Sequence, residues 1–474
     1  MLEYETELVR IAGFNDGPAI AEHLKNLMHR AVQNAQEEKD PDGAATSGFA
    51  RAAIEYLVAK EGDLDLSTLL ATVQATTRIL FRTTAARRQL IAGVDYFQFL
   101  AFLANRIALP VLQNVILAQG RTICYLASQI YPIGGHTRVI EDLIRLAPSY
   151  RHVLIVTNPE DWETVRVESA IRRGTHCELC VLEGTDTIAK VREGARILAA
   201  NAPSTVVAVG HPDDPIVPIL LSMTPAGKKL HVHHADHMFS LVPSSKDIPV
   251  VVLFRGAEGA LRSAGIDNLV YLPVTCTDPR LIAAVDQGGP VPRSGAHVFT
   301  TTTSGSSNKF DPRAGADYLD LMEMRYRARG GRHVHFGPLM PDTLAHIDLL
   351  LSRMRRHGDF VHVPFVPYLS HALATLQPDL YIGSYPMGGK RASVEAMAAA
   401  CPIAAWQTEG YHSAAEIIYP EHLRWNNLSE LAAIITGFSE QTGKLHQEYS
   451  RDYFEQNHSE AFLRDGLYSL LEAV

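Results

Sequence analysis

The sequence predicts an α/β protein with two Rossmann-like domains facing each other across a cleft, preceded by an all-helical domain. Three observations lead to this prediction. Residues 1–117 carry apolar side chains at helical spacing, whereas from Thr122 short apolar runs alternate with helical stretches. A turn of the form Tyr-Pro-x-Gly-Gly-x occurs twice, at Tyr131 and at Tyr385. A stretch rich in glycine and proline, Asp286–Ala296, separates the two copies and is typical of an interdomain linker.

The helical domain is assigned to residues 1–117 because this part of the chain has almost no strand-like alternation. Residues 37–47 have the composition of a loop. Helices are expected in four segments: Ala19–Glu37, Gly48–Lys60, Leu66–Leu80 and Phe97–Leu117.

The two Rossmann-like domains are assigned to residues 118–288 and 289–474, the second ending in a helical tail from Leu428. Strands that alternate with helices form βαβ units, and these produce a parallel sheet covered on both faces. Strands are expected in the first of these domains at Thr122–Gln129, Val153–Thr157, Glu178–Leu182, Thr205–Val209, Leu230–His234, Val250–Phe254 and Leu269–Leu272. In the second they are expected at Val298–Thr302, His333–Phe336, Val361–Val363, Leu380–Gly383 and Ile403–Trp406.

Composition excludes several classes of protein. The 474 residues are 46% hydrophobic and 20% charged, as in ordinary globular proteins, and the net charge of −9 argues against a nucleic-acid partner. Five cysteines show no disulfide framework, and Cys177 and Cys180 form an isolated C-x-x-C that is more typical of structural cysteines than of a metal site. No signal sequence and no membrane span are indicated, so we expect a cytoplasmic location.

The second glycine turn carries the clearest site signal. Gly388 and Gly389 follow a short apolar strand and precede an alanine-rich helix, where backbone N–H groups and the helix dipole favour an anion such as phosphate. Lys390 adds a positive charge to this turn, and Glu395 lies one and a half turns into the helix, where a carboxylate can face a sugar hydroxyl. Alternatively, the glycines only allow tight packing in an ordinary α/β turn.

The first copy of the turn has the same spacing. Gly134 and Gly135 lie at its centre, His136 stands where the second copy has Lys390, and Glu141 follows the first glycine by seven residues, as Glu395 does. One such turn in each half favours two Rossmann-like domains.

A lysine loop follows the first strand of the C-terminal half. The loop is polar and ends in Asn308-Lys309-Phe310, from which a lysine can reach a diphosphate as a point charge. Alternatively, Lys309 is a solvated loop residue.

At these residues the sequence resembles the GT-B glycosyltransferases, which hold a sugar nucleotide mainly against their C-terminal domain. The resemblance covers residues 121 to 474. The loop from Asn308 to Pro312 is similar to the diphosphate-binding lysine loop of the O-linked N-acetylglucosamine transferases and of the bacterial cytoplasmic N-glycosyltransferases, and the latter also have an all-helical domain ahead of the GT-B pair. The resemblance implies that Asn308, Lys309 and the turn Gly388-Gly389-Lys390 bind the diphosphate and that Glu395 takes the ribose hydroxyls.

One departure bears on stereochemistry. Many retaining GT-B enzymes carry a glutamate eight residues before the ribose-binding glutamate, and Met387 stands there in this chain. The resemblance therefore implies an inverting displacement, in which a base or a proton relay assists the acceptor.

Candidates for the base are histidines at the expected carboxyl ends of strands in the first Rossmann-like domain. His136 and His237 are preferred, His136 because it mirrors Lys390 and His237 because Asp236 adjoins it. His211 and the cluster from His231 to His234 are further candidates. Alternation places His231 and His233 on one face, and the H-x-H spacing also admits a metal site.

The function predicted from the sequence is transfer of a hexose or N-acetylhexosamine from a nucleoside-diphosphate sugar, a UDP-sugar, to a protein or glycan acceptor. No cofactor is expected beyond this donor substrate, and no metal ion. Two alternatives stay open: a UDP-sugar 2-epimerase, and a non-catalytic GT-B-like binding protein. The sequence names neither the sugar nor the acceptor, and it leaves the oligomeric state open, a homo-oligomer included.

Overall fold

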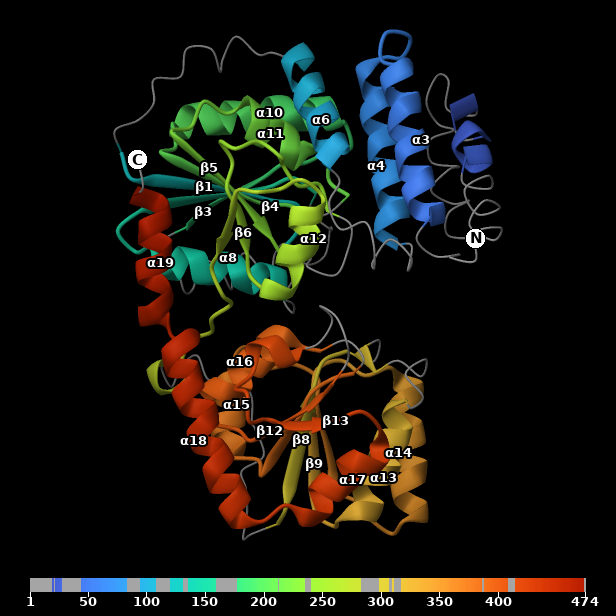
Figure 1. Ribbon diagram of the computed structural model, residues 1–474, viewed down its shortest axis with the longest axis vertical. Coiled ribbons are helices and arrows are strands. Elements are labelled where there is room, and N and C mark those ends of the chain that lie inside the picture. The colour runs from blue at the N-terminus through green and yellow to red at the C-terminus, as the bar shows by residue number, and fades with distance from the viewer. Residues whose placement is uncertain are drawn as a thin grey trace. The chain divides into compact units, whose positions relative to one another are not determined.

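The protein is described from a computed structural model (Figure 1). The structure describes residues 19–20, 22–27, 44–82, 94–107, 120–130, 135–158, 177–211, 213–234, 240–282, 298–306, 309–310, 317–385, 388–407 and 414–472. His237, Asn308, Gly134 and Met387 of the sequence predictions lie outside these residues.

The chain divides into two compact units. Unit 1 comprises Met1–Leu272 and Leu471–Val474, and unit 2 comprises Pro273–Leu470. Residues 273–288, assigned above to the first Rossmann-like domain, therefore fall in unit 2. The helices at the start of the chain group with the first sheet in unit 1.

Among the described residues ahead of the first sheet are the helices α3 (Ala44–Ala59), α4 (Leu66–Arg82) and α6 (Val94–Ile107). Asp65 caps α4, since its carboxylate accepts hydrogen bonds from the Thr68 backbone N–H (3.0 Å) and hydroxyl (2.6 Å). Buried apolar residues of α3, α4, α6, α11 (Ile216–Met223) and strands of the sheet belong to one hydrophobic core. This shared core explains why the helices and the sheet form a single unit.

The sheet of unit 1 has seven parallel strands in the order β3-β2-β1-β4-β5-β6-β7. The chain switches direction across the sheet between β1 and β4, which is the Rossmann strand order. The strands are β1 (Thr122–Ala127), β2 (Arg151–Val156), β3 (Cys177–Val181), β4 (Thr205–Val209), β5 (Lys228–His233), β6 (Val250–Val252) and β7 (Leu269–Tyr271). In Figure 1, α10 (Thr187–Asn201) and α11 cover one face, and α8 (Gly135–Leu146) and α12 (Glu258–Ser263) the other.

The sheet of unit 2 has six parallel strands in the order β10-β9-β8-β11-β12-β13, which repeats the Rossmann order with its switch between β8 and β11. The strands are β8 (Thr300–Ser304), β9 (Arg332–Phe336), β10 (Phe360–Val363), β11 (Leu380–Ile382), β12 (Ile403–Trp406) and β13 (Leu423–Trp425). One face packs against α13 (Tyr318–Ala328), α14 (Pro341–Arg353) and α17 (Leu428–Gly437), and the other against α15 (Leu369–Leu376), α16 (Lys390–Ala398) and α18 (Glu440–Asn457) (Figure 1). The last helix is α19 (Glu460–Glu472).

The two predicted Rossmann-like sheets are confirmed, and all twelve expected strands form. The prediction missed β13, which adds an edge strand beside β12. The expected helical tail is present as α17, α18 and α19. The five cysteines are free thiols, as the lack of a framework predicted. Among the described helices, none combines the length and the apolarity needed to cross a bilayer.

The two copies of the glycine turn occupy different places in their sheets. The first copy precedes α8 and follows β1, the first strand of unit 1, whereas the second precedes α16 and follows β11, the fourth strand of unit 2. Both positions border the switch point of their own sheet.

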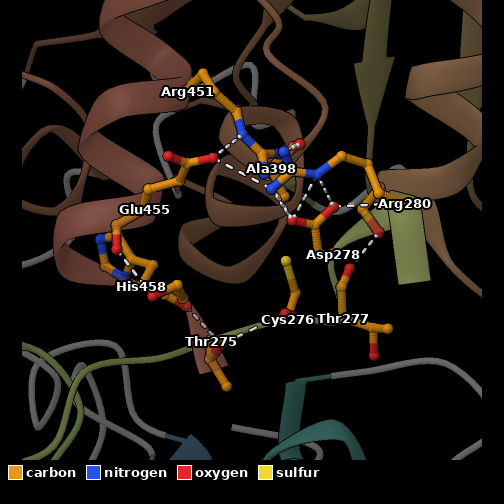
Figure 2. Close-up of polar contacts among 11 residues, drawn as sticks. Thr275, Cys276, Thr277, Asp278, Arg280, Ala398, Arg451, Glu455 and His458 are labelled. Carbon is orange, nitrogen blue, oxygen red and sulfur yellow. Dashed lines mark hydrogen bonds and ion pairs between the residues drawn. The ribbon is translucent and has the colours of Figure 1, made fainter. Parts of the chain in front are cut away.

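The segment that enters unit 2 is fixed to α18 by polar contacts (Figure 2). Asp278 accepts hydrogen bonds from Arg280 (2.7 Å) and from Arg451 of α18 (2.6 Å). The Thr275 hydroxyl donates to the backbone carbonyl of His458 (2.5 Å), and the His458 ring contacts the carbonyl of Val274 (2.7 Å). These contacts make residues 274–280 an integral part of unit 2.

Candidate active site

A positively charged loop lies at the carboxyl end of β8 in unit 2. The strand ends at Ser304, and Gly305 turns the chain with a φ of +130° that favours glycine. The loop closes through a hydrogen bond from the Lys309 backbone N–H to the Ser306 carbonyl (3.0 Å). Phe310 is buried, with its ring centroid 4.6 Å from that of Tyr318 and 5.7 Å from that of Tyr385. This aromatic packing fixes the position of the neighbouring Lys309.

The Lys309 ammonium is partly buried. Burial lowers the pKa of its side chain, and within the described part of the chain the Lys309 ammonium has no carboxylate or carbonyl partner. A desolvated cation that lacks a protein partner is a strong attractor for an anion.

The second glycine turn lies directly beside this lysine. A Cβ placed on Gly389 would be 3.6 Å from Lys309 Nζ and 3.4 Å from the Ser384 hydroxyl. Gly389 is the N-cap of α16, and no side chain caps the helix there. The ammonium, the N–H groups of the first turn and the helix dipole therefore act on one small volume at the carboxyl ends of β8 and β11.

Gly388 has a packing role. A Cβ on this residue would lie 2.6 Å from the backbone nitrogen of Ala414, in the short helix η6 (Ala414–Ile417). The two interpretations of the turn therefore each apply to one glycine. Gly388 permits close packing, and Gly389 keeps space open for an anion beside Lys309.

The Lys390 side chain is engaged elsewhere. Its ammonium is buried and forms an ion pair with Glu416 of η6. Its backbone N–H donates to the Gly388 carbonyl (3.1 Å). Lys390 therefore joins the turn to η6, and its charge is already neutralised within the protein.

Glu395 is held in place by two donors. One carboxylate oxygen lies 3.1 Å from Arg391 Nε, and the other accepts the backbone N–H of Ser370 at 3.1 Å. Each carboxylate oxygen has a second lone pair, so the group retains the capacity to accept two hydroxyl hydrogen bonds. The contact with α15 was not predicted, because Ser370 and Glu395 are 25 residues apart.

At the opposite edge of the same sheet, the cations that the structure describes around an open hollow are already paired. An open hollow of about 770 Å³ lies there, lined in part by Arg280, Lys444 and Arg451. Carboxylates already pair with these side chains: Asp278 with both arginines and Glu440 with Lys444. The carboxyl edge near Lys309 is the better anion site.

Unit 1 gathers histidines at the carboxyl edge of its own sheet. His136, in the first turn of α8, places Nε2 2.6 Å from the Val209 carbonyl, and its ring centroid is 4.5 Å from that of His234. Burial first, and then the neighbouring His211, lower the pKa of His136 to about 4. Burial is also the main cause that lowers the pKa of His234 well below its ordinary value, followed by the neighbouring His136 and His211. Both imidazoles are therefore neutral at neutral pH.

The other predicted residues of unit 1 differ in their surroundings. His231 and His233 are buried in β5, and so are Leu230 and Val232 between and beside them. Gly135 begins α8 as an exposed residue, and a Cβ added to it would have open space around it. His234, which was only one of several candidates, contacts His136, and a histidine directly after a strand was the signal for it. Within the described residues, no group of three or more metal-ligating side chains is found.

Comparison with known proteins gives a structural match only. No protein-family profile and no curated protein sequence matches the chain. A glycosyltransferase from Rickettsia africae is similar in structure, with a TM-score of 0.58 and 14% identity, over 75% of this chain and 99% of that one. Anabaena HepE, solved with UDP and glucose, has a TM-score of 0.55 and 13% identity, over 75% of this chain and 100% of that one.

A third structure reaches further along the chain. A variant of the O-GlcNAc transferase from Thermobaculum terrenum has a TM-score of 0.50 and 14% identity, and it covers 97% of this chain and 99% of that one. The chain has the GT-B fold. The first two matches cover 75% of this chain, and the third covers 97% of it.

Proposed function

We propose that the protein is a glycosyltransferase that moves a hexose or N-acetylhexosamine from a UDP-sugar to a protein or glycan acceptor. The observation that carries the proposal is the Lys309 ammonium, which pairs with no carboxylate among the described residues and lies beside the N-terminus of α16. This combination suits a diphosphate, whose two negative charges need a cation and several N–H donors. Glu395, fixed one and a half turns along the same helix, suits the ribose hydroxyls.

The named neighbours support this choice of donor. HepE was solved with UDP and glucose, and another neighbour is an O-GlcNAc transferase. The deciding experiment incubates the protein with UDP-glucose and UDP-N-acetylglucosamine, each labelled in the sugar, and follows the label. Transfer or slow hydrolysis with release of UDP supports the proposal. Formation of the C2 epimer would indicate the isomerase, and binding without any reaction would indicate a binding protein.

We also propose that no divalent cation is required. Lys309 and the helix N-terminus offset the charge of the leaving diphosphate, which is the task that a metal ion performs in other sites. Full turnover in excess chelator is the expected result. Strict dependence on added magnesium or manganese would contradict it and would direct attention to the histidines of unit 1.

The stereochemical proposal is inversion, supported by Met387 in the position where many retaining enzymes carry a glutamate. An α-linked donor then yields a β-linked product through a single displacement, with a base assisting the acceptor. The anomeric coupling constant of the product, measured by NMR, tests this proposal. An α-linked product from an α-linked donor would refute it.

A further inference from the structure

Ser370 forms hydrogen bonds in two directions within unit 2. It is the second residue of α15 and is 1% exposed. Its backbone N–H donates to Glu395 Oε2 of α16 (3.1 Å), and its hydroxyl donates to the backbone carbonyl of Thr277 (3.0 Å). One buried serine therefore joins the carboxylate of the proposed donor site to residues 274–280, the segment through which the chain enters unit 2.

The bond from the Ser370 N–H holds Glu395 at the N-terminus of α15. The N-cap residue of this helix, Tyr368, makes no side-chain capping bond, so the first N–H groups of α15 need acceptors from elsewhere in the fold. The Glu395 carboxylate supplies one, and its negative charge is favoured at the positive end of the helix dipole. The position of the carboxylate therefore depends on where the first turn of α15 lies.

The Ser370 hydroxyl ties this turn to a distant part of the chain. Several serines of the described helices bond instead to the carbonyl four residues earlier in their own helix, among them Ser222, Ser352 and Ser469. The Ser370 hydroxyl bonds to Thr277, 93 residues away. It therefore contributes to the tertiary structure around α15 and not to the helix itself.

Thr277 lies between two anchored neighbours (Figure 2). On one side the Thr275 hydroxyl donates to the backbone carbonyl of His458, and on the other Asp278 accepts a hydrogen bond from Arg451 of α18. These contacts hold the Thr277 carbonyl in place as an acceptor. Hydrogen bonds thus connect α18, this segment, α15 and the carboxylate in α16.

We propose that Ser370 is a positioning residue for the donor, and that it couples ribose binding at Glu395 to the anchoring of residues 274–280. This inference rests on the proposed function, which assigns the ribose hydroxyls to Glu395. Because such coupling is reciprocal, a ribose that stabilises the carboxylate also stabilises the segment, and a loosened segment weakens ribose binding.

The coupled segment has a special place in the chain. It follows β7 and Leu272, the last residue of unit 1 before the chain enters unit 2. The residues that connect the two units therefore respond to the binding of the donor.

The first test compares two ligands by isothermal titration calorimetry: UDP, and dideoxy-UDP, in which hydrogen replaces both ribose hydroxyls. Ser370→Ala keeps the backbone N–H to Glu395 and removes only the hydroxyl. It should weaken UDP binding by about threefold or more, within the effect of one hydrogen bond, and change the binding of dideoxy-UDP by less than about twofold.

Ser352→Ala is the matched control, because it removes a hydroxyl-to-carbonyl bond in α14. It should leave the affinities for both ligands unchanged. If Ser370→Ala has equal effects on the two ligands, or no effect on either, its role does not involve the ribose and the proposal is overturned.

The second test measures amide hydrogen exchange in the ligand-free, full-length chain. The backbone N–H groups of Arg280 and Leu281 bond to Asp278, so their exchange reports how firmly the segment is anchored. Ser370→Ala and Glu395→Ala should each accelerate exchange over residues 274–282 by about two- to tenfold, because each removes a hydrogen bond from the connection.

Ser352→Ala should leave this exchange unchanged. Saturating UDP should slow it in the wild-type protein and slow it less in Ser370→Ala. Unchanged exchange in Glu395→Ala would overturn the coupling. Circular dichroism verifies that each variant is folded, and if Glu395→Ala is not, Ser370→Ala still decides both tests.

The two tests separate this inference from the proposed function. If the wild-type protein does not bind UDP, the proposed donor site fails, while exchange in the ligand-free variants still measures the connection from Glu395 to the segment. If the protein transfers sugar and Ser370→Ala changes neither the preference for UDP over dideoxy-UDP nor the exchange of residues 274–282, the proposed function stands and the coupling is refuted.

Discussion

At the scale of single residues, Lys309 is the most direct test of the donor site. Lys309→Ala should remove a charge-assisted contact worth about 1.5–3 kcal/mol, and so weaken UDP binding by roughly 10- to 150-fold. Isothermal titration calorimetry measures this change. Lys444→Ala, which removes an exposed lysine that pairs with Glu440, is the matched control. A loss of less than about threefold for Lys309→Ala would place this residue outside the site.

The glycine pair gives a second prediction at this scale, because its members have different neighbours. Gly388→Ala places a methyl group 2.6 Å from the backbone of Ala414 and should lower the free energy of unfolding by about 1–3 kcal/mol. In Gly389→Ala the added methyl group lies 3.4 Å or more from its neighbours, so the free energy of unfolding should change less than in Gly388→Ala. Its methyl group would nevertheless occupy the space beside Lys309 and weaken UDP binding.

Thermal unfolding and calorimetric titration of the two variants, done side by side, check this prediction. Equal losses of stability, or UDP binding unaffected by Gly389→Ala, would contradict the division of roles.

At the scale of elements, β8 is unusual because a central strand of the sheet consists of hydroxyl-bearing residues, all buried. Thr301 and Thr303 contact the ring nitrogens of His333 at 2.8 and 3.0 Å, and Thr303 contacts His335 at 2.8 Å. Burial is the main cause that lowers the pKa of His335 to about 3 and that of His333 well below its ordinary range. The core beneath the lysine loop is therefore a network of neutral histidines.

This network predicts acid sensitivity. The unfolded chain has histidines with pKa values near 6.5, so between about pH 6.5 and pH 3 it binds more protons than the folded protein. The contribution of these histidines to the free energy of unfolding is therefore complete above about pH 6.5 and is lost as the pH falls. Urea unfolding at about pH 7 and about pH 5 measures the decrease in the free energy of unfolding. Other buried histidines contribute to this decrease in the same direction.

Two variants isolate the contribution of the network. His335→Gln should flatten the pH dependence, and His346→Gln, at an exposed position of α14, should leave it unchanged. The same slope in both variants would show that the network does not titrate as described.

Most strands and part of the candidate site could be predicted from the sequence. Twelve strands were predictable because buried parallel strands read as runs of apolar or β-branched residues bounded by turns, and the threonines of β8 belong to the β-branched kind. The strand β13 was missed because its three residues include the exposed Arg424 and give too short a pattern. Gly389 and Lys309 were predictable from local chemistry. The pairing of Lys390 with Glu416, 26 residues away, depends on tertiary packing, and no local pattern reports it.

At the scale of the whole molecule, the division into units predicts that donor binding resides in unit 2. Lys309, Gly389 and Glu395 all lie within Pro273–Leu470, which also has its own hydrophobic core. A fragment of residues 273–470 should fold and bind UDP with an affinity within a few-fold of the full chain. Calorimetry on this fragment, with its Lys309→Ala variant as control, tests the prediction. A folded fragment that fails to bind UDP would count against the assignment.

The placement of the glycine turns has a consequence for the history of the chain. If one ancestral Rossmann unit had been copied together with its turn, both copies would follow the same strand of their sheets. Here one follows the first strand and the other the fourth. The shared Tyr-Pro-x-Gly-Gly spacing therefore does not mark an in-register duplication of one Rossmann unit. An alignment of the two halves that matched Tyr131 to Tyr385 would displace every other element by three strands.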